Sequence, residues 1–229
     1  MEREKKRRRE MEQRSSEIGC AIEELSMMVV VKPRDDDSDG DEVGFVSTKS
    51  FLSLCYLVLQ VLDKIGPTMA VLRQDIHHNI KRLEVMYESN PSMNSNMVEI
   101  LKTEKSLGNA KKGPTCSKAF VWLTRSLEFA LALLQSLEGD GGKNMEEAVE
   151  ECYNNTLKPW HGWISSAAFR VALKLMPDSK TFMDLLKEKD ENYDALKEKM
   201  HYLVSLLAPF LHDIHSILRI YNLDKLKST

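Results

Sequence analysis

The 229-residue sequence has few residues that break or cross-link a chain, with 10 glycines, 7 prolines and 4 cysteines. The cysteines stand far apart and none belongs to a C-x-x-C pair, so neither a disulfide framework nor a cysteine zinc site is predicted. We expect reduced, buried thiols at the four positions, which are Cys20, Cys55, Cys116 and Cys152.

Segments that would direct the chain into a membrane are also missing. No apolar run approaches the ~20 residues that cross a bilayer. The opening residues MEREKKRRRE continue into Glu, Gln and Ser rather than into the apolar segment of a secretory signal. The sequence therefore predicts a cytoplasmic protein.

The usual signatures of catalysis and cofactor binding are absent. The sequence contains no G-x-S-x-G, H-E-x-x-H, P-loop or dinucleotide-binding glycine pattern. Two histidine pairs, His77 with His78 and His212 with His215, lack further ligands at a recognisable spacing. We therefore predict no enzyme activity, no cofactor and no metal site.

Charge is nearly balanced, since 32 basic and 35 acidic residues give a formal net charge of -3. No global field would recruit nucleic acid. Locally, residues 1–14 carry seven Lys or Arg and are predicted to form a disordered basic arm, which could be a nuclear address or touch anionic lipid. Residues 32–44 are predicted to form a flexible acidic loop, without the ligand spacing of an EF-hand.

Apolar residues at helical spacing dominate the rest of the chain, and 42% of all residues are hydrophobic. The pattern predicts one all-α domain over 15–229 with about eight or nine helices, no strands and no internal repeat. Ser47 or Thr48 is expected to cap the second helix. The expected helices span 15–31, 51–65, 69–87, 92–107, 116–137, 145–153, 164–176, 182–186 and 196–218.

The helix over 69–87 carries polar residues on its apolar side. At about 100° per residue, Asp75 and Arg82 lie about 40° and 60° from Asn79, which falls in the middle of the apolar sector. Together a carboxylate, an amide and a guanidinium could bind a ligand rich in hydroxyl groups. The alternative is an internally satisfied trio, with an Asp75–Arg82 pair closed by Asn79 or by a backbone group.

Three further residues have both a structural and a functional interpretation. Trp122 on the 116–137 helix is either a core aromatic or a platform for a sugar ring or a cation. Lys118, one turn earlier, could hold an anion or extend to water. His161 lies between Trp160 and Trp163 at the entry of a helix, where it is either packed or functional.

Three motifs together resemble the glycolipid transfer protein family. They are D-I-x-x-N-I-x-R-L-E at 75–84, V-W-L-T-R-S-L-E-F at 121–129 and W-H-G-W-I at 160–164. The resemblance runs from about residue 51 to the C-terminus and excludes the basic arm and the acidic loop. It implies a two-layer all-helical sandwich, with the head group of one lipid in a surface cleft and its hydrocarbon chains between the layers.

The resemblance also implies residue roles. Asp75 and Asn79 would bond sugar hydroxyls, Trp122 would stack under the sugar, and His161 would bond the ceramide amide carbonyl. Arg82 stands where the family usually has Lys, so the geometry of the head group would differ. Trp163 matches a position that touches the membrane surface. The implied activity is intermembrane transfer of a glycosphingolipid by a monomer that contacts membranes transiently.

Two alternatives remain. Relatives that carry ceramide-1-phosphate have Lys in place of Asn79 and Arg in place of Trp122, which favours a neutral sugar here. Lys118 matches an extra Arg of that branch, so a phosphate head group stays open. The second alternative is a lipid-sensing adaptor that binds lipid without transferring it.

Overall fold

A computed structural model describes residues 16–31, 44–139 and 144–227. The predicted basic arm and nearly all of the predicted acidic loop lie outside these residues. In the described part the chain forms nine α-helices, one 3-10 turn and two short strands. In order, the elements are α2 (Glu17–Met27), β1 (Val30–Val31), β2 (Phe45–Val46), α3 (Thr48–Ile65), η1 (Pro67–Met69), α4 (Ala70–Ser89), α5 (Met97–Ser106), α6 (Cys116–Glu138), α7 (Met145–Thr156), α8 (Trp163–Leu173), α9 (Ser179–Leu186) and α10 (Tyr193–Ile220).

The all-α prediction is confirmed, and local capping residues set several helix boundaries. The hydroxyl of Ser47 accepts from the backbone N–H of Ser50 at 3.2 Å and starts α3. Helix α3 ends at Gly66, where the backbone turns to a φ of 110°. This conformation would strain any residue with a Cβ, so glycine is suited to the position. Thr115 caps α6 by accepting from the N–H of Lys118 at 3.2 Å.

The predicted absence of strands was wrong, and so were several helix boundaries, most of all the end of the first helix and the start of the fourth. The helix expected over 15–31 ends at Met27, because Val30–Val31 pairs antiparallel with Phe45–Val46. The helix expected from residue 92 begins at Met97, and residues before it form turns. Asn96 caps this helix, α5, by accepting from the N–H of Val98 at 3.0 Å.

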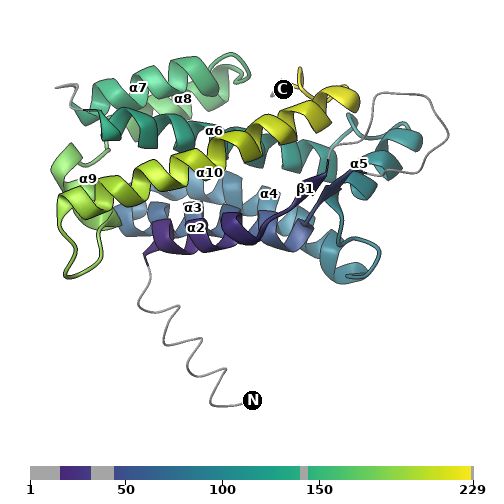
Figure 1. Ribbon diagram of the computed structural model, residues 1–229. Coiled ribbons are helices and arrows are strands. Elements are labelled where there is room, and N and C mark those ends of the chain that lie inside the picture. The colour runs from purple at the N-terminus through teal and green to yellow at the C-terminus, as the bar shows by residue number, and fades with distance from the viewer. Residues whose placement is uncertain (1–15, 32–43, 140–143, 228–229) are drawn as a thin grey trace.

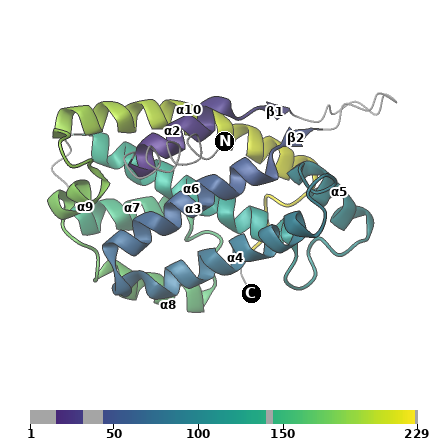
Figure 2. The ribbon, with the colours of Figure 1, turned by 90° about the horizontal axis from the view of Figure 1, so that it is seen from below.

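The helices are arranged in two layers (Figure 1). Helices α2, α3 and α4 form one layer, and α6, α7 and α8 form the other, while α10 packs on both α6 and α2. Seen from below, α3 and α4 run side by side across α6 (Figure 2). Phe51 of α3 and Phe120 of α6 are fully buried, and their ring centroids lie 4.7 Å apart. Helix α6 is therefore at the centre of the core.

Helix α10 is long and apolar, although no uninterrupted apolar run in the sequence is long enough to cross a bilayer. By length and composition alone it is the one helix in the described residues that could cross a bilayer. One side of it is buried against α6 and α2, including Leu203, Leu207 and Ile214. This arrangement is that of an amphipathic core helix.

A buried carboxylate fixes the start of α6. Glu104 of α5 accepts from the backbone N–H groups of Cys116 at 2.9 Å and Ser117 at 2.7 Å, and from the Ser117 hydroxyl at 2.5 Å. A negative charge is favourable at a helix N-terminus, where the N–H groups lack partners within the helix. Glu104 thereby positions the turn that precedes Trp122.

Candidate functional site

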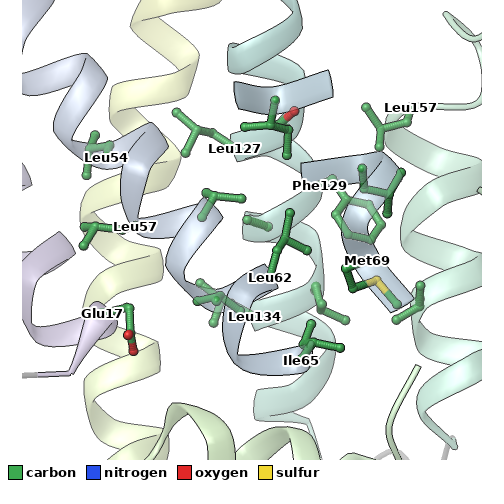
Figure 3. Close-up of a pocket in the computed structure, with 18 of the residues that line it drawn as sticks. Glu17, Leu54, Leu57, Leu62, Ile65, Met69, Leu127, Phe129, Leu134 and Leu157 are labelled. Carbon is green, nitrogen blue, oxygen red and sulfur yellow. The ribbon is translucent and has the colours of Figure 1, made fainter. Parts of the chain in front are cut away.

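An apolar cavity of about 230 Å³ lies among the helices, lined by residues of α2, α3, α4, α6, α7, α8, α9 and α10. Leucines from α3 and α6 surround it together with Phe129 (Figure 3). Its only lining carboxylates in the described residues are Glu17 and Asp75, and His161 also lines it. The walls therefore suit hydrocarbon, and the polar groups are few.

The polar face of α4 is organised around Asn79. The Asn79 amide donates to the backbone carbonyl of Asp75 at 3.0 Å, and Arg82 donates to Asn79 Oδ1 at 3.1 Å. Asn79 is buried, whereas Asp75 is reached by solvent. The Asp75–Arg82 pair of the internally satisfied trio does not form, because Arg82 bonds Asn79 instead.

Asp75 is left with its carboxylate oxygens available. Among the described residues it has no side-chain hydrogen bond or ion pair, and it lines the cavity. Protein atoms around it displace water and raise its pKa, an effect that His78 and Arg82 oppose. An acceptor-only group at the edge of an apolar cavity suits a ligand that supplies O–H or N–H donors.

Trp122 and His161 line the same cavity from different elements. Their ring centroids lie 5.5 Å apart and the planes are inclined by 38°. Trp122 is half-buried on α6, and His161 lies in the connection between α7 and α8. Burial, with a further contribution from Arg125, lowers the pKa of His161. The imidazole is therefore neutral at pH 7 and carries one N–H.

Tyr153 contacts His161 on the Nδ1 side of the imidazole. The Tyr153 hydroxyl lies 3.3 Å from His161 Nδ1 and 3.1 Å from the Ser166 hydroxyl. The Tyr153 ring stacks on Phe169 with centroids 3.6 Å apart and an interplanar angle of 8°. Sequence reasoning did not single out Tyr153. The i, i+8 spacing to His161 spans a helix end, so no helical periodicity connects the two.

Arg125 is a second residue that sequence reasoning missed. Its side chain is buried at 3% exposure, and its guanidinium lies over the rings of Trp122 at 4.8 Å and Trp160 at 4.2 Å. Its Nη2 donates to the backbone carbonyl of Asp224 at 3.0 Å. The one available signal was the W-x-x-R spacing, which places a cation one turn after Trp122.

Four of the predicted residues, Asn79, Arg82, Lys118 and Trp163, lie outside the cavity lining. Lys118 is half-buried one turn before Trp122, and its ammonium makes no hydrogen bond or ion pair with the described residues. Trp163 is 81% exposed at the start of α8, next to the exposed Ile164. The structure therefore brings Asp75, Trp122 and His161 together, with Asn79 and Arg82 adjacent on α4, and leaves Trp163 on the surface.

The fold and the cavity define a class of protein. Two helical layers enclose an apolar space, and hydrogen-bonding groups from α4, α6 and the α7–α8 connection meet at its edge. This combination suits a carrier of an amphiphile, whose apolar part is buried and whose polar part is bonded at the surface.

Comparisons with known proteins place the chain more narrowly. The family model of the glycolipid transfer protein (GLTP) matches residues 46–188. Glycolipid transfer protein 3 of Arabidopsis thaliana is 51% identical over 98% of this chain and 99% of its own length. The chain belongs to the glycolipid transfer protein family, and its members transfer lipids.

Solved structures share the fold. One, described as showing how FAPP2 selects simple glycosphingolipids using the GLTP-fold, has a TM-score of 0.79 and 23% identity, covering 94% of this chain and 100% of the other. The apo form of mouse ceramide-1-phosphate transfer protein has a TM-score of 0.76 and 15% identity, covering 93% and 100%. At these identities the likeness concerns the fold and leaves the head group open.

Proposed function

We propose that this protein transfers a glycosphingolipid with a simple neutral sugar, such as glucosyl- or galactosylceramide, between membranes. The observation that carries the proposal is the meeting of Asp75, Trp122 and His161 at one apolar cavity. Each exposed CH₂ costs about 0.8 kcal/mol in water, so a two-chain ceramide crosses the aqueous phase only when sheltered. The cavity supplies that shelter without covalent chemistry.

The α4 residues recognise the sugar. Asp75 accepts from sugar hydroxyls, because its carboxylate oxygens have no other partner among the described residues. Asn79 keeps one of its two amide hydrogens after bonding the Asp75 carbonyl, and Arg82 keeps several donors after bonding Asn79. A head group that left these groups unpaired would lose about 1–3 kcal/mol for each.

Trp122 and His161 act at the junction of sugar and ceramide. The indole of Trp122 offers a flat apolar surface for the sugar ring. A neutral His161 can donate from Nε2 to the ceramide amide carbonyl, provided that Nδ1 accepts a hydrogen bond. The Tyr153 hydroxyl, 3.3 Å from Nδ1, can supply it.

The exposed residues at the start of α8 make the membrane contact. Trp163 and Ile164 are 81% and 61% exposed, and an indole is suited to the interface between lipid and water. We place the protein in the cytoplasm as a monomer of one domain over 15–229, with transient contact to membranes. Nuclear targeting would depend on the basic arm.

A ceramide-1-phosphate carrier is the second candidate, and Lys118 favours it. The Lys118 ammonium lies one turn from Trp122 without a hydrogen bond or ion pair to the described residues, so it is available to an anion. The mouse transfer protein that shares the fold is named for that phosphate lipid. Trp122 and Asn79 weigh against it, since a phosphate would favour cations at both positions.

Transfer between vesicles tests the proposal. Donor vesicles carry labelled glucosylceramide, and acceptor vesicles are assayed after addition of the protein, with unlabelled ceramide-1-phosphate as a competitor. Asp75→Val should abolish transfer while the far-UV circular dichroism of a folded helical protein persists. Stronger competition by ceramide-1-phosphate than by glucosylceramide would support the second candidate. Lipid that is bound but never released would identify a lipid-sensing adaptor instead.

A further inference from the structure

We propose that Arg125 is a positioning residue for the head-group site, where its buried guanidinium holds the indole of Trp122 and packs on Trp160, the residue before His161. This inference rests on the proposed function, because it concerns the same site. Arg125 itself is absent from the cavity lining, so it acts through the residues that touch the ligand.

The contacts of Arg125 link the two elements that carry Trp122 and His161. The guanidinium covers one face of Trp122 at 4.8 Å and lies 4.2 Å from the ring of Trp160, the residue that precedes His161. A planar guanidinium stacks on aromatic faces in a way that an ammonium does not. With Arg125 over one face of Trp122, the indole plane is held, and a sugar ring would stack on the opposite face.

A residue near the C-terminus, Asp224, also holds the guanidinium of Arg125. Its Nη2 donates to the backbone carbonyl of Asp224 at 3.0 Å, and Arg125 forms no hydrogen-bonded ion pair with a described carboxylate. Nη1 is buried without a hydrogen-bond partner in the described residues. Burial lowers the pKa of Arg125 to about 10, although Glu128 and Asp224 oppose the effect.

Such a placement is costly for stability. A buried cation without a paired carboxylate loses hydration that its hydrogen bonds replace only in part. Replacement by an apolar side chain of similar length should therefore leave the fold intact or make it more stable. The benefit of Arg125 lies in the arrangement of the two indoles and in its positive charge near His161, which disfavours protonation of the imidazole.

Arg125→Met and Arg125→Lys in the full chain separate these two effects. Affinities for vesicles with glucosylceramide and with ceramide are compared, and the titration of His161 is followed by NMR. Arg125→Met should lose about tenfold in the preference for glucosylceramide over ceramide, with a raised pKa of His161. Arg125→Lys should keep the charge, and with it the wild-type titration, but recover only part of the preference because it lacks the planar stack.

The control is Arg219→Met, which removes an exposed arginine of α10. It should change neither readout. A folded Arg125→Met that keeps both the wild-type preference for glucosylceramide over ceramide and the wild-type titration of His161 would overturn the inference. If Arg125→Met fails to fold, a wild-type preference in Arg125→Lys would overturn the role of the planar stack. Failure of the wild-type protein to bind glucosylceramide would count against the proposed function, while the His161 titration would still decide the electrostatic role of Arg125.

Discussion

Replacing Tyr153 by Phe removes the hydroxyl that lies beside Nδ1 of His161 and leaves the rest of the site in place. The stacking of the ring on Phe169, at 3.6 Å and 8°, does not involve the hydroxyl. The hydroxyl does make the contacts with His161 Nδ1 at 3.3 Å and with the Ser166 hydroxyl at 3.1 Å. The substitution therefore tests the imidazole rather than the packing.

The hydroxyl has one hydrogen, so it donates either to Ser166 or to His161. In this structure the Tyr153 hydroxyl donates to Ser166, so for His161 Nε2 to donate to an amide carbonyl, Tyr153 must turn its hydrogen to Nδ1 and accept from the Ser166 hydroxyl instead. Net contributions of about 0.5–1.5 kcal/mol for each hydrogen bond predict a stability loss of about 1–3 kcal/mol in Tyr153→Phe. Without its partner at Nδ1, the imidazole loses its fixed tautomer, and glucosylceramide affinity should fall about tenfold, which corresponds to about 1.4 kcal/mol.

The assay compares glucosylceramide with its N-deacylated form, which lacks the amide carbonyl. Tyr153→Phe should weaken binding of the first and spare the second, and nitrogen NMR of the imidazole should report a changed tautomer. Ser166→Ala should have a smaller effect, since Tyr153 can still donate to His161. Equal losses for both lipids, or no loss for either with folded protein, would refute the assigned role of His161.

Three further outcomes are expected. Trp163→Ala should reduce vesicle binding and transfer rate without lowering Tm, because the side chain is 81% exposed; an unchanged rate would exclude the membrane contact. Glu104→Gln should destabilise the fold by about 2–3 kcal/mol in urea, since the start of α6 loses a charged acceptor, whereas Lys102→Gln on the exposed side of α5 should not. Glu128 has a pKa raised by burial from 4.5 to about 7, so the folded state binds more protons in that window. The contribution of Glu128 to stability should fall as the pH rises from about 4.5 to about 7 and then level off, whereas its contact partner His215, whose pKa burial lowers, acts in the opposite direction as the pH rises toward 6.5. The difference between the wild type and Glu128→Gln in urea titrations at each pH isolates the Glu128 contribution.

The fold could be predicted where its signals are local. Ser47 and Thr115 each bond a backbone N–H three residues away, and both helices begin beside the predicted positions. Helix α6, expected over 116–137, spans Cys116–Glu138. Apolar periodicity and a cap are properties of neighbouring residues, so a single sequence contains them.

The wrong boundaries depend on contacts between distant residues. Asn96 accepts from the backbone N–H of Val46 at 3.1 Å and donates to the carbonyl of Gly44 at 2.8 Å, across about 50 residues of sequence. These bonds hold Asn96 as the cap of α5 beside the short β1–β2 pair. Nothing in the local pattern after Pro91 distinguishes a turn from the first turn of a helix.

In the candidate site, too, some features follow from local sequence and others depend on which contacts form. The side of α4 that carries Asp75, Asn79 and Arg82 follows from helical geometry, but the partner of Arg82 does not. Asp75 and Arg82 are seven residues apart, about 10 Å along the axis, whereas Asn79 lies within one turn of each. The nearer amide therefore takes the guanidinium at 3.1 Å and leaves the carboxylate free.

The head-group site and the cavity share one helix, and this has a consequence for recognition. Helix α6 presents Trp122 beside the site, while Phe129 and Leu133 line the cavity farther along. Its start is fixed by Glu104 of α5, and Arg125 ties its middle to Asp224, 99 residues away. A shift of α6 to admit hydrocarbon would therefore move the indole as well, so the length of the lipid chains and the fit of the sugar should be coupled in this protein.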